Sequence, residues 1–172
     1  AGFASIDVGR QLDITKMLTI VLMFIGASPS STGGGIKTTT FVVIISTVLS
    51  VLRGKNETVL KKRRVDRTVV YRSLSIVVLS VLVVIITTVV IAIAESSHNV
   101  SALDALFESV SAFGTVGLTA GITQGLTVVS KIALIITMFI GRVGPISLLL
   151  ALTMHHNSRL ETILPEGKII VG

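Results

Sequence analysis

The stretch SVSAFGTVGL at residues 109–118 decides the fold, because it places Thr-Val-Gly at the end of a short apolar helix between two segments of membrane length. Backbone carbonyls can replace the water shell of a cation only if the strand that carries them is held inside protein at membrane depth. Glycine gives such a strand the backbone freedom that it needs. This context predicts a cation filter at residues 114–118, built on Thr115, Val116 and Gly117.

A second copy of this pattern lies at the start of the chain. Matches that share one ungapped register are Gly2 with Gly117, Lys16 with Lys131, Ile20 with Ile135, and MFIG at 23–26 with MFIG at 138–141. Apolar segments often match by chance at Ile or Val, but not at a glycine, a lysine and a four-residue run together. We infer an internal duplication. In this register the chain begins inside the filter of the first copy, so we expect the helices before that filter to lie in sequence outside the chain.

The composition is that of an integral membrane protein. Hydrophobic residues make up 51% of the 172 residues and charged residues 14%, and the mean hydropathy is +0.90. These values lie outside the ordinary soluble range. The lack of cysteine excludes a disulfide framework and thiolate metal sites. The lack of tryptophan and the single tyrosine count against this interpretation, because they leave only thin aromatic belts.

The first spanning segment is interrupted. Its apolar halves, 17–25 and 39–52, flank the run GASPSSTGGGIKT at 26–38. At a rise of about 1.5 Å per residue, neither half alone crosses a hydrocarbon core of about 30 Å, whereas together they do. Irregular backbone at that depth is tolerated only when it is buried in protein or lines a cavity. We therefore expect an intramembrane loop; the alternative is an ordinary extramembrane loop between two short helices.

Two further spanning segments enclose a shorter helix. The segment at 69–94 is an uninterrupted apolar run, and a third segment covers 126–152. Between them, residues 102–113 follow the capping-box-like sequence SALD at 101–104 and are too few to span. This arrangement predicts a re-entrant pore helix whose negative C-terminal end favours a cation at the filter.

Charge placement predicts the topology. Eight of the 15 basic residues lie between positions 53 and 72, which makes this loop cytoplasmic by the positive-inside rule. The net charge of +6 is then a topological signal and not a sign of nucleic-acid binding, although it favours contact with anionic lipids. Both filter regions are expected to face outward.

Arg142 lies in the middle of the third segment, where a charge costs a few kcal/mol. We expect it to face a cavity or a partner; the alternative is an arginine tied to carbonyls at the kink of residues 141–145. The repeat register places Arg142 opposite Ala27, so the expected acceptors are the loop carbonyls and the hydroxyls of Ser28, Ser30 and Ser31. An arginine below a cation filter would also repel the permeating ion.

No pattern predicts an enzyme or an organic cofactor. The run GGGIKT at 33–38 lacks the spacing of a nucleotide-binding glycine loop. His155 and His156 are adjacent, so on a helix they would point apart, and no carboxylate or cysteine joins them. Neither a Ser-His-Asp constellation nor a pair of carboxylates at catalytic spacing is present.

Together, the filter Thr115-Val116-Gly117, the broken segment 26–38, Arg142 and the run PEGKIIVG at 165–172 resemble the Trk/Ktr/HKT superfamily of cation transporters, over essentially the whole chain. The resemblance implies an all-α integral membrane fold with repeats of outer helix, re-entrant pore helix, filter and inner helix, as in potassium channels, with one broken inner helix. The ranges that it implies are 1–52 for the end of the third repeat, 53–68 for a basic cytoplasmic loop, 69–152 for the fourth repeat and 153–172 for a cytoplasmic tail.

The resemblance further implies K⁺ uptake by a multi-pass protein of the plasma membrane, with Na⁺ as a second candidate ion. Gly2 and Gly117 would be two of four filter glycines, with K⁺ bound at Val116 and Gly117. Arg142 would form part of a barrier beside an intramembrane gate loop. The implied gate residues are Gly26, Ala27, Ser28, Pro29, Ser30, Ser31, Thr32, Gly33, Gly34, Gly35, Ile36 and Lys37. Leu118 and Phe3 stand where potassium channels carry tyrosine, which implies weaker discrimination between K⁺ and Na⁺.

The implied partners are the remaining N-terminal repeats of the same polypeptide, a second copy in a homodimer, and a cytoplasmic nucleotide-binding ring that contacts 53–72 and 153–172. Two other functions remain open from the residues. One is a secondary transporter that binds an anionic substrate at Lys37, where the helix is discontinuous. The other is a membrane anchor without transport activity.

Overall fold

The computed structural model describes residues 2–29, 31–54, 57–60, 63–96 and 100–144. Its elements in chain order are η1 (Val8–Arg10), α1 (Asp13–Phe24), α2 (Thr38–Leu52), β1 (Val59–Leu60), β2 (Arg63–Arg64), α3 (Arg67–Ala94), α4 (Ala102–Phe113), η2 (Thr123–Gly125) and α5 (Val128–Val143). This largely helical structure agrees with the predicted all-α class. The segment predicted as a plain loop at 53–68 differs, because β1 and β2 form a short antiparallel hairpin there. The end of the third segment at 145–152, the tail at 153–172 and Ser30 lie outside the described residues.

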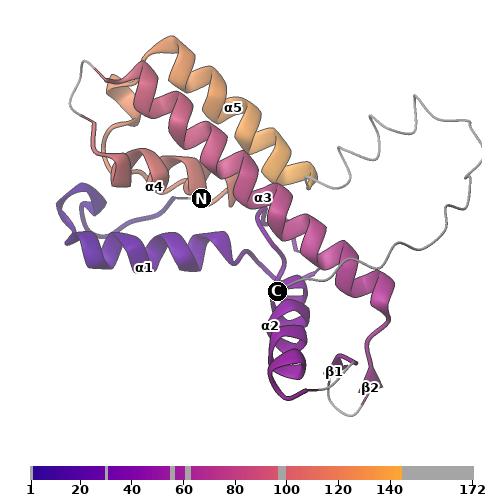
Figure 1. Ribbon diagram of the computed structural model, residues 1–172. Coiled ribbons are helices and arrows are strands. Elements are labelled where there is room, and N and C mark those ends of the chain that lie inside the picture. Colours follow the sequence, from indigo (N-terminus) through magenta and orange to yellow (C-terminus); the bar gives the residue numbers. More distant parts are fainter. Residues whose placement is uncertain (1, 30, 55–56, 61–62, 97–99, 145–172) are drawn as a thin grey trace, which may run out of the picture.

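Helix α4 lies at the centre of the arrangement (Figure 1) and packs against α1, α3 and α5. Every residue from Phe107 to Phe113 is buried, which makes α4 the main contributor to the core. Helices α3 and α5 run side by side, whereas α2 and the hairpin lie at the other end of α3. The short helix that carries the candidate filter is therefore enclosed by three other helices.

The caps explain where two of these helices begin. Asp66 accepts a hydrogen bond from the Thr68 N–H, so α3 starts at Arg67, slightly before the apolar run. The Ser101 hydroxyl accepts a hydrogen bond from the Leu103 N–H at the start of α4. The Asp104 carboxylate forms an ion pair with Lys16. Among the described contacts, the predicted capping box therefore has the hydrogen bond to the serine hydroxyl but not the return hydrogen bond to the aspartate.

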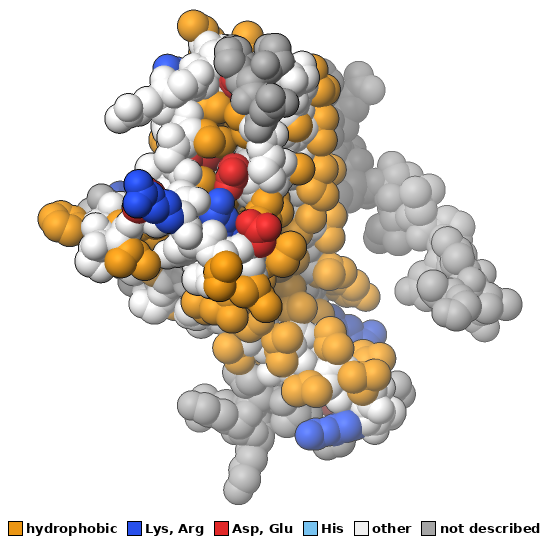
Figure 2. Space-filling view, turned by 90° about the vertical axis from the view of Figure 1, so that its left-hand side faces the viewer, with side chains coloured by type: hydrophobic (Ala, Val, Ile, Leu, Met, Phe, Trp, Pro, Cys, Tyr) orange, Lys and Arg blue, Asp and Glu red, His pale blue; other side chains and the backbone are white. Residues whose placement is uncertain are grey.

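Helix α3 is the one helix among the described residues that is long and apolar enough to cross a membrane. Much of the visible face in Figure 2 is covered by hydrophobic side chains. Exposed large apolar residues occur on α1, α2, α3 and α5; Leu22, for example, is 61% exposed and Leu52 76%. A surface of this kind fits contact with lipid or with further protein better than contact with water.

The described residues support the internal duplication. The same offset that aligns Gly2 with Gly117 also aligns the start of η1 with that of η2, and the start of α1 with that of α5. Both aligned glycines have positive φ angles, 68° at Gly2 and 84° at Gly117. The copies then diverge, because α1 ends at Phe24 whereas α5 continues past the matching Phe139 to Val143.

Candidate functional site

The candidate filter segment, residues 114–118, is attached to the last turn of α4. Three of its N–H groups donate to α4 carbonyls, and one of its carbonyls accepts a hydroxyl hydrogen bond. These contacts are Gly114 N to Val110 O at 2.8 Å, Thr115 N to Ala112 O at 3.1 Å, Val116 N to Ser111 O at 3.0 Å, and Ser111 Oγ to Leu118 O at 2.5 Å. The C-terminal end of the short helix thus fixes the course of the segment.

The backbone of this segment is strained. Thr115 has a φ of 53° and is the one non-glycine residue with positive φ in the described part of the chain. A β-branched residue rarely adopts this conformation, and such strain persists mainly at functional sites. Gly117 has a φ of 84°, and a Cβ added to Gly2 would collide with its carbonyl group. The two aligned glycines are therefore in close backbone contact.

The loop between α1 and α2 satisfies many of its own polar groups. Gly26 N donates to Ile36 O at 2.8 Å, and Ile36 N donates to Phe24 O at 3.3 Å, which joins the two ends of the loop. The Lys37 ammonium donates to Gly33 O at 2.5 Å and to Ser31 O at 3.3 Å. Lys37 therefore neutralises the negative ends of the loop's own carbonyls.

The loop contacts the candidate filter directly. The Gly34 N–H donates to Thr115 Oγ1 at 2.8 Å, and Gly34 is buried. A Cβ added to Gly34 would lie 2.7 Å from Thr115 Cγ2 and 3.0 Å from Gly141 O, so only glycine fits at this contact. An open hollow of about 440 Å³ is lined by the end of α1, by loop residues Gly26, Ala27 and Gly33, and by residues 114–116. We call it the filter hollow.

Arg142 is exposed in the last turn of α5. Among the described residues, no hydrogen bond or ion pair joins it to the loop, so the predicted pairing with Ser28 or Ser31 is not formed there. The neighbouring Gly141 is the residue of α5 that faces α4 and the loop, since its own added Cβ would collide with the Phe113 carbonyl. Two facts explain why Arg142 does not pair with the loop. Successive helix residues point about 100° apart, so Arg142 does not share the direction of Gly141. Lys37 already binds the carbonyls of Ser31 and Gly33.

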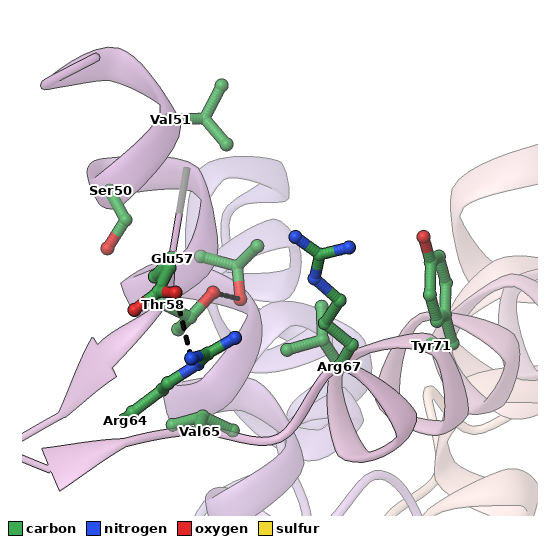
Figure 3. Close-up of a pocket in the computed structure, with 10 residues that line it drawn as sticks. Ser50, Val51, Glu57, Thr58, Arg64, Val65, Arg67 and Tyr71 are labelled. Carbon is green, nitrogen blue, oxygen red and sulfur yellow. Dashed lines mark hydrogen bonds and ion pairs between the residues drawn. The ribbon is translucent and has the colours of Figure 1, made fainter. Parts of the chain in front are cut away.

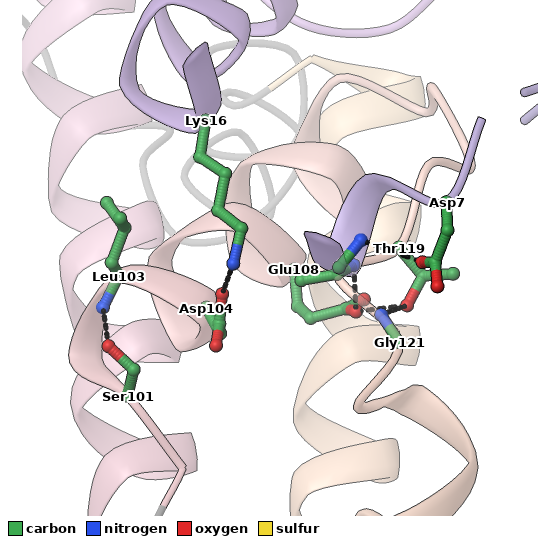
Figure 4. A network of polar contacts seen from close by, with 10 residues as sticks. Asp7, Lys16, Ser101, Leu103, Asp104, Glu108, Thr119 and Gly121 are labelled. Atoms are coloured by element: carbon green, nitrogen blue, oxygen red, sulfur yellow. Dashed lines mark hydrogen bonds and ion pairs between the residues drawn. The ribbon is translucent and has the colours of Figure 1, made fainter. Parts of the chain in front are cut away.

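Sequence reasoning missed three buried charged groups around α4 and the start of α5. Lys16 of α1 is 6% exposed and forms an ion pair with Asp104 of α4 at 2.7 Å (Figure 4). Glu108 of α4 and Glu95 after α3 are 5% and 1% exposed and accept hydrogen bonds from the segments that precede α5. The sequence did contain a signal for these groups, because each is a charged residue beside or within an apolar helix. Burying such a charge is costly unless a partner compensates it.

The Lys16–Asp104 ion pair connects the two copies, and we expect Lys16→Met to lower the free energy of unfolding by about 2–3 kcal/mol. The reason is that Asp104, with a side chain 20% exposed, would lose its counter-ion. Thermal unfolding of the purified gene product would measure the loss, and Lys16→Met with Asp104→Leu should restore most of it. Lys131→Met is the matched control, because this aligned lysine is exposed and donates only to the Gln124 carbonyl among the described residues. A loss as large in the control would contradict the assignment.

A second hollow, the hairpin pocket, lies away from the filter. It has a volume of about 310 Å³ and is lined by residues of α2, the hairpin and the start of α3 (Figure 3). Arg64 pairs with Glu57 at 2.9 Å, and Arg67 lies between this pair and Tyr71 in the view of Figure 3. The pocket belongs to the basic segment that the charge pattern predicts to be cytoplasmic. None of its lining residues belongs to the candidate filter segment.

Comparison with known proteins identifies the family of the chain. The TrkH family, described as a cation transport protein, matches residues 1–162. The chain is 40% identical to the Ktr system potassium uptake protein B of Bacillus subtilis (strain 168) over 172 residues, the whole chain and 38% of that protein. It is 37% identical over 172 residues to the protein of the same name from Vibrio alginolyticus, again the whole chain and 37% of that protein.

A third relative is the potassium/sodium uptake protein NtpJ of Enterococcus hirae, 33% identical over 174 residues that cover the whole chain and 39% of that protein. The chain thus spans less than two fifths of the length of these relatives. Their names describe transport proteins and not enzymes, as the sequence analysis expected. The match over residues 1–162 confirms the resemblance inferred from the motifs, and the chain belongs to the TrkH family of cation transport proteins.

Proposed function

We propose that this chain forms part of a K⁺ uptake protein of the plasma membrane, with a filter built from Gly2, Thr115, Val116 and Gly117. The observation that carries the proposal is the hydrogen bond from the Gly34 N–H to Thr115 Oγ1 at 2.8 Å. It joins an irregular loop within a broken apolar segment to a strained residue of the Thr-Val-Gly strand. A contact of this kind places the loop where it can block the filter.

The loop of residues 26–37 is the proposed gate. Its buried residue Gly34 lies against Thr115 on one side and Gly141 on the other, so the loop fills the space between the filter segment and α5. Displacing it would open the filter hollow toward α1 and α5. Arg142, one residue beyond Gly141, is the proposed electrostatic part of the barrier. K⁺ would bind at the carbonyls of Val116 and Gly117, where glycine and the strained threonine allow them to turn.

The contacts of Lys37 favour a cation over an anion as the transported ion. A secondary transporter that binds an anionic substrate at a half-helix N-terminus needs an available positive group there. Here the Lys37 ammonium is bound by two carbonyls of the loop itself. Apart from the carbonyls of Ser31 and Gly33, which Lys37 binds, the loop carbonyls and hydroxyls present negative dipole ends, which suit a cation. The relatives' names point in the same direction, and the name of NtpJ extends the proposal to Na⁺ as a second ion.

The proposal includes the rest of a pore. Two filter strands do not close a ring, so the remaining strands would come from other repeats of the same polypeptide in a multi-pass protein. The exposed apolar faces of α1, α2 and α5 are available for these repeats, for a second copy in a homodimer and for lipid. The basic segment at 53–72 is the proposed contact surface for a cytoplasmic regulatory ring and for anionic lipids.

The test is K⁺ uptake by potassium-starved cells that lack their own uptake systems and express the complete gene product. We expect uptake from micromolar to millimolar external K⁺, with a preference for K⁺ over Na⁺. Cells that carry the empty vector are the control. Good membrane expression of the protein without uptake of either ion would overturn the proposal and would favour the secondary transporter or the anchor.

A further inference from the structure

A buried carboxylate lies directly behind the segment that follows the filter. Glu108 of α4 is 5% exposed, and its Oε1 accepts hydrogen bonds from Thr119 Oγ1 at 2.5 Å, Thr123 Oγ1 at 3.0 Å and Ala120 N at 3.1 Å (Figure 4). In the described part of the chain, Glu108 has no ion-pair partner. A buried carboxylate is costly unless hydrogen bonds compensate the loss of water, so these three contacts are what holds it in place.

The same contacts close a small network over residues 119–123. Thr119 Oγ1 lies 2.6 Å from Thr123 Oγ1 and accepts a hydrogen bond from the Gly121 N–H at 2.9 Å. Glu108 Oε1 therefore binds the hydroxyls of Thr119 and Thr123 and the N–H of Ala120 directly. Through Thr119 it also holds the N–H of Gly121. The network begins one residue after Leu118, the last residue of the filter segment.

Glu108 and Ser111 attach the outer end of the filter to α4 from the same face of the helix. Residues three apart on a helix are neighbours, and Ser111 Oγ holds the Leu118 carbonyl at 2.5 Å. The inner end of the segment is held separately, by the backbone contacts of Gly114 and Thr115 with α4. Glu108 adds the attachment that keeps the chain after Leu118 from moving away from α4.

We propose that Glu108 is a positioning residue for ion selectivity, which acts on the filter through Thr119, Thr123 and Leu118 and does not touch the ion. This inference rests on the proposed function. Discrimination between K⁺ and Na⁺ depends on the number and placement of the carbonyls around the ion. Without the Glu108 contacts, the outer end of the filter is held to α4 by the Ser111 hydrogen bond to Leu118 alone. A filter with this weaker outer attachment can close more easily around the smaller ion. Loss of the Glu108 contacts should therefore admit more Na⁺.

The experiment compares the ratio of K⁺ to Na⁺ uptake in cells that express the complete gene product or its variants. Glu108→Gln keeps the size of the side chain but weakens its bonds to the hydroxyls, and we expect the ratio to fall by roughly fivefold. Thr119→Val with Thr123→Val removes the two hydroxyl donors and leaves the carboxylate unchanged, and the same fall is expected. Gln124→Ala, an exposed residue in the same turn, is the matched control and should keep the wild-type ratio.

The ratio of K⁺ to Na⁺ uptake distinguishes a positioning role of Glu108 from a general structural role, because poor folding lowers the uptake of both ions equally. It also separates positioning from a direct effect of the Glu108 charge, which the double threonine variant retains. A wild-type ratio in that double variant would overturn the proposal, whatever Glu108→Gln shows. If the wild-type protein transports neither ion, the proposed function fails together with this inference; if the wild-type protein is selective and the variants are equally selective, only the inference fails.

Discussion

Gly117→Ser is expected to lower the ratio of K⁺ to Na⁺ uptake by roughly tenfold. Gly117 has a φ of 84°, and a residue with a side chain pays about 1–2 kcal/mol for this left-handed conformation. Serine would relieve the strain by rotating the peptide, which moves a carbonyl that we place at the ion. A change of about 1.4 kcal/mol in the relative binding of two ions corresponds to a factor of about ten.

The measurement is uptake of both ions by potassium-starved cells, at equal amounts of protein in the membrane. Gly54→Ser is the matched control, because Gly54 also has a positive φ, 68°, and an added Cβ meets nothing within 4 Å. Gly54 follows α2, far along the chain from the filter, so its substitution should leave the ratio unchanged. Unaltered selectivity in Gly117→Ser would refute the placement of Gly117 in the filter.

Deletion of residues 28–35 is expected to raise the rate of K⁺ uptake by roughly tenfold, because it removes the proposed gate from the filter hollow. The deletion takes away Gly34 and with it the hydrogen bond to Thr115. The new junction would join Ala27 to Ile36, and these ends already lie close together. Gly26 N donates to Ile36 O at 2.8 Å and Thr38 N to Ala27 O at 3.4 Å, so α1 and α2 can keep their places.

The rate per molecule, at saturating external K⁺, is the quantity to compare. Thr39→Ala is the control beside the loop, since Thr39 lies outside the proposed gate, is exposed, and its side chain makes no hydrogen bond with the described residues. It should leave the rate unchanged. A deletion variant that reaches the membrane, keeps its preference for K⁺ and transports at the wild-type rate would remove the loop from the gating mechanism.

Local signals in the sequence located the α-helices but not all of their ends, since α1 begins at Asp13 and not at residue 17, and α5 ends at Val143, within the segment expected at 126–152. Residues 102–113 were expected as a short helix from the cap at Ser101 and the apolar run, and α4 has the same bounds. The glycines and the proline at 26–38 marked the interruption between α1 and α2. The hairpin of β1 and β2 was missed, because two-residue strands leave no periodic pattern and basic residues dominate that segment.

The contacts of the candidate site were less predictable, since they join residues far apart in the chain. The sequence marked Gly34 and Thr115 as members of two motifs but gave no distance between them. It also placed Arg142 at the depth of the loop, whereas Gly141 is the residue of α5 that contacts Gly34. Glu108 was overlooked although a carboxylate in an apolar helix was itself a signal, because its donors at 119–123 look like ordinary turn residues.

The ion pair between Lys16 and Asp104 also bears on how the protein is made. Its partners are 88 residues apart in the chain, so at a synthesis rate of about 5–20 residues per second Asp104 is made roughly 4–18 s after Lys16. During this interval the apolar helix α1 carries a charge without its counter-ion, which disfavours full entry into a bilayer. The ion pair that buries Lys16 in the first copy can therefore form only after the second copy has been synthesised.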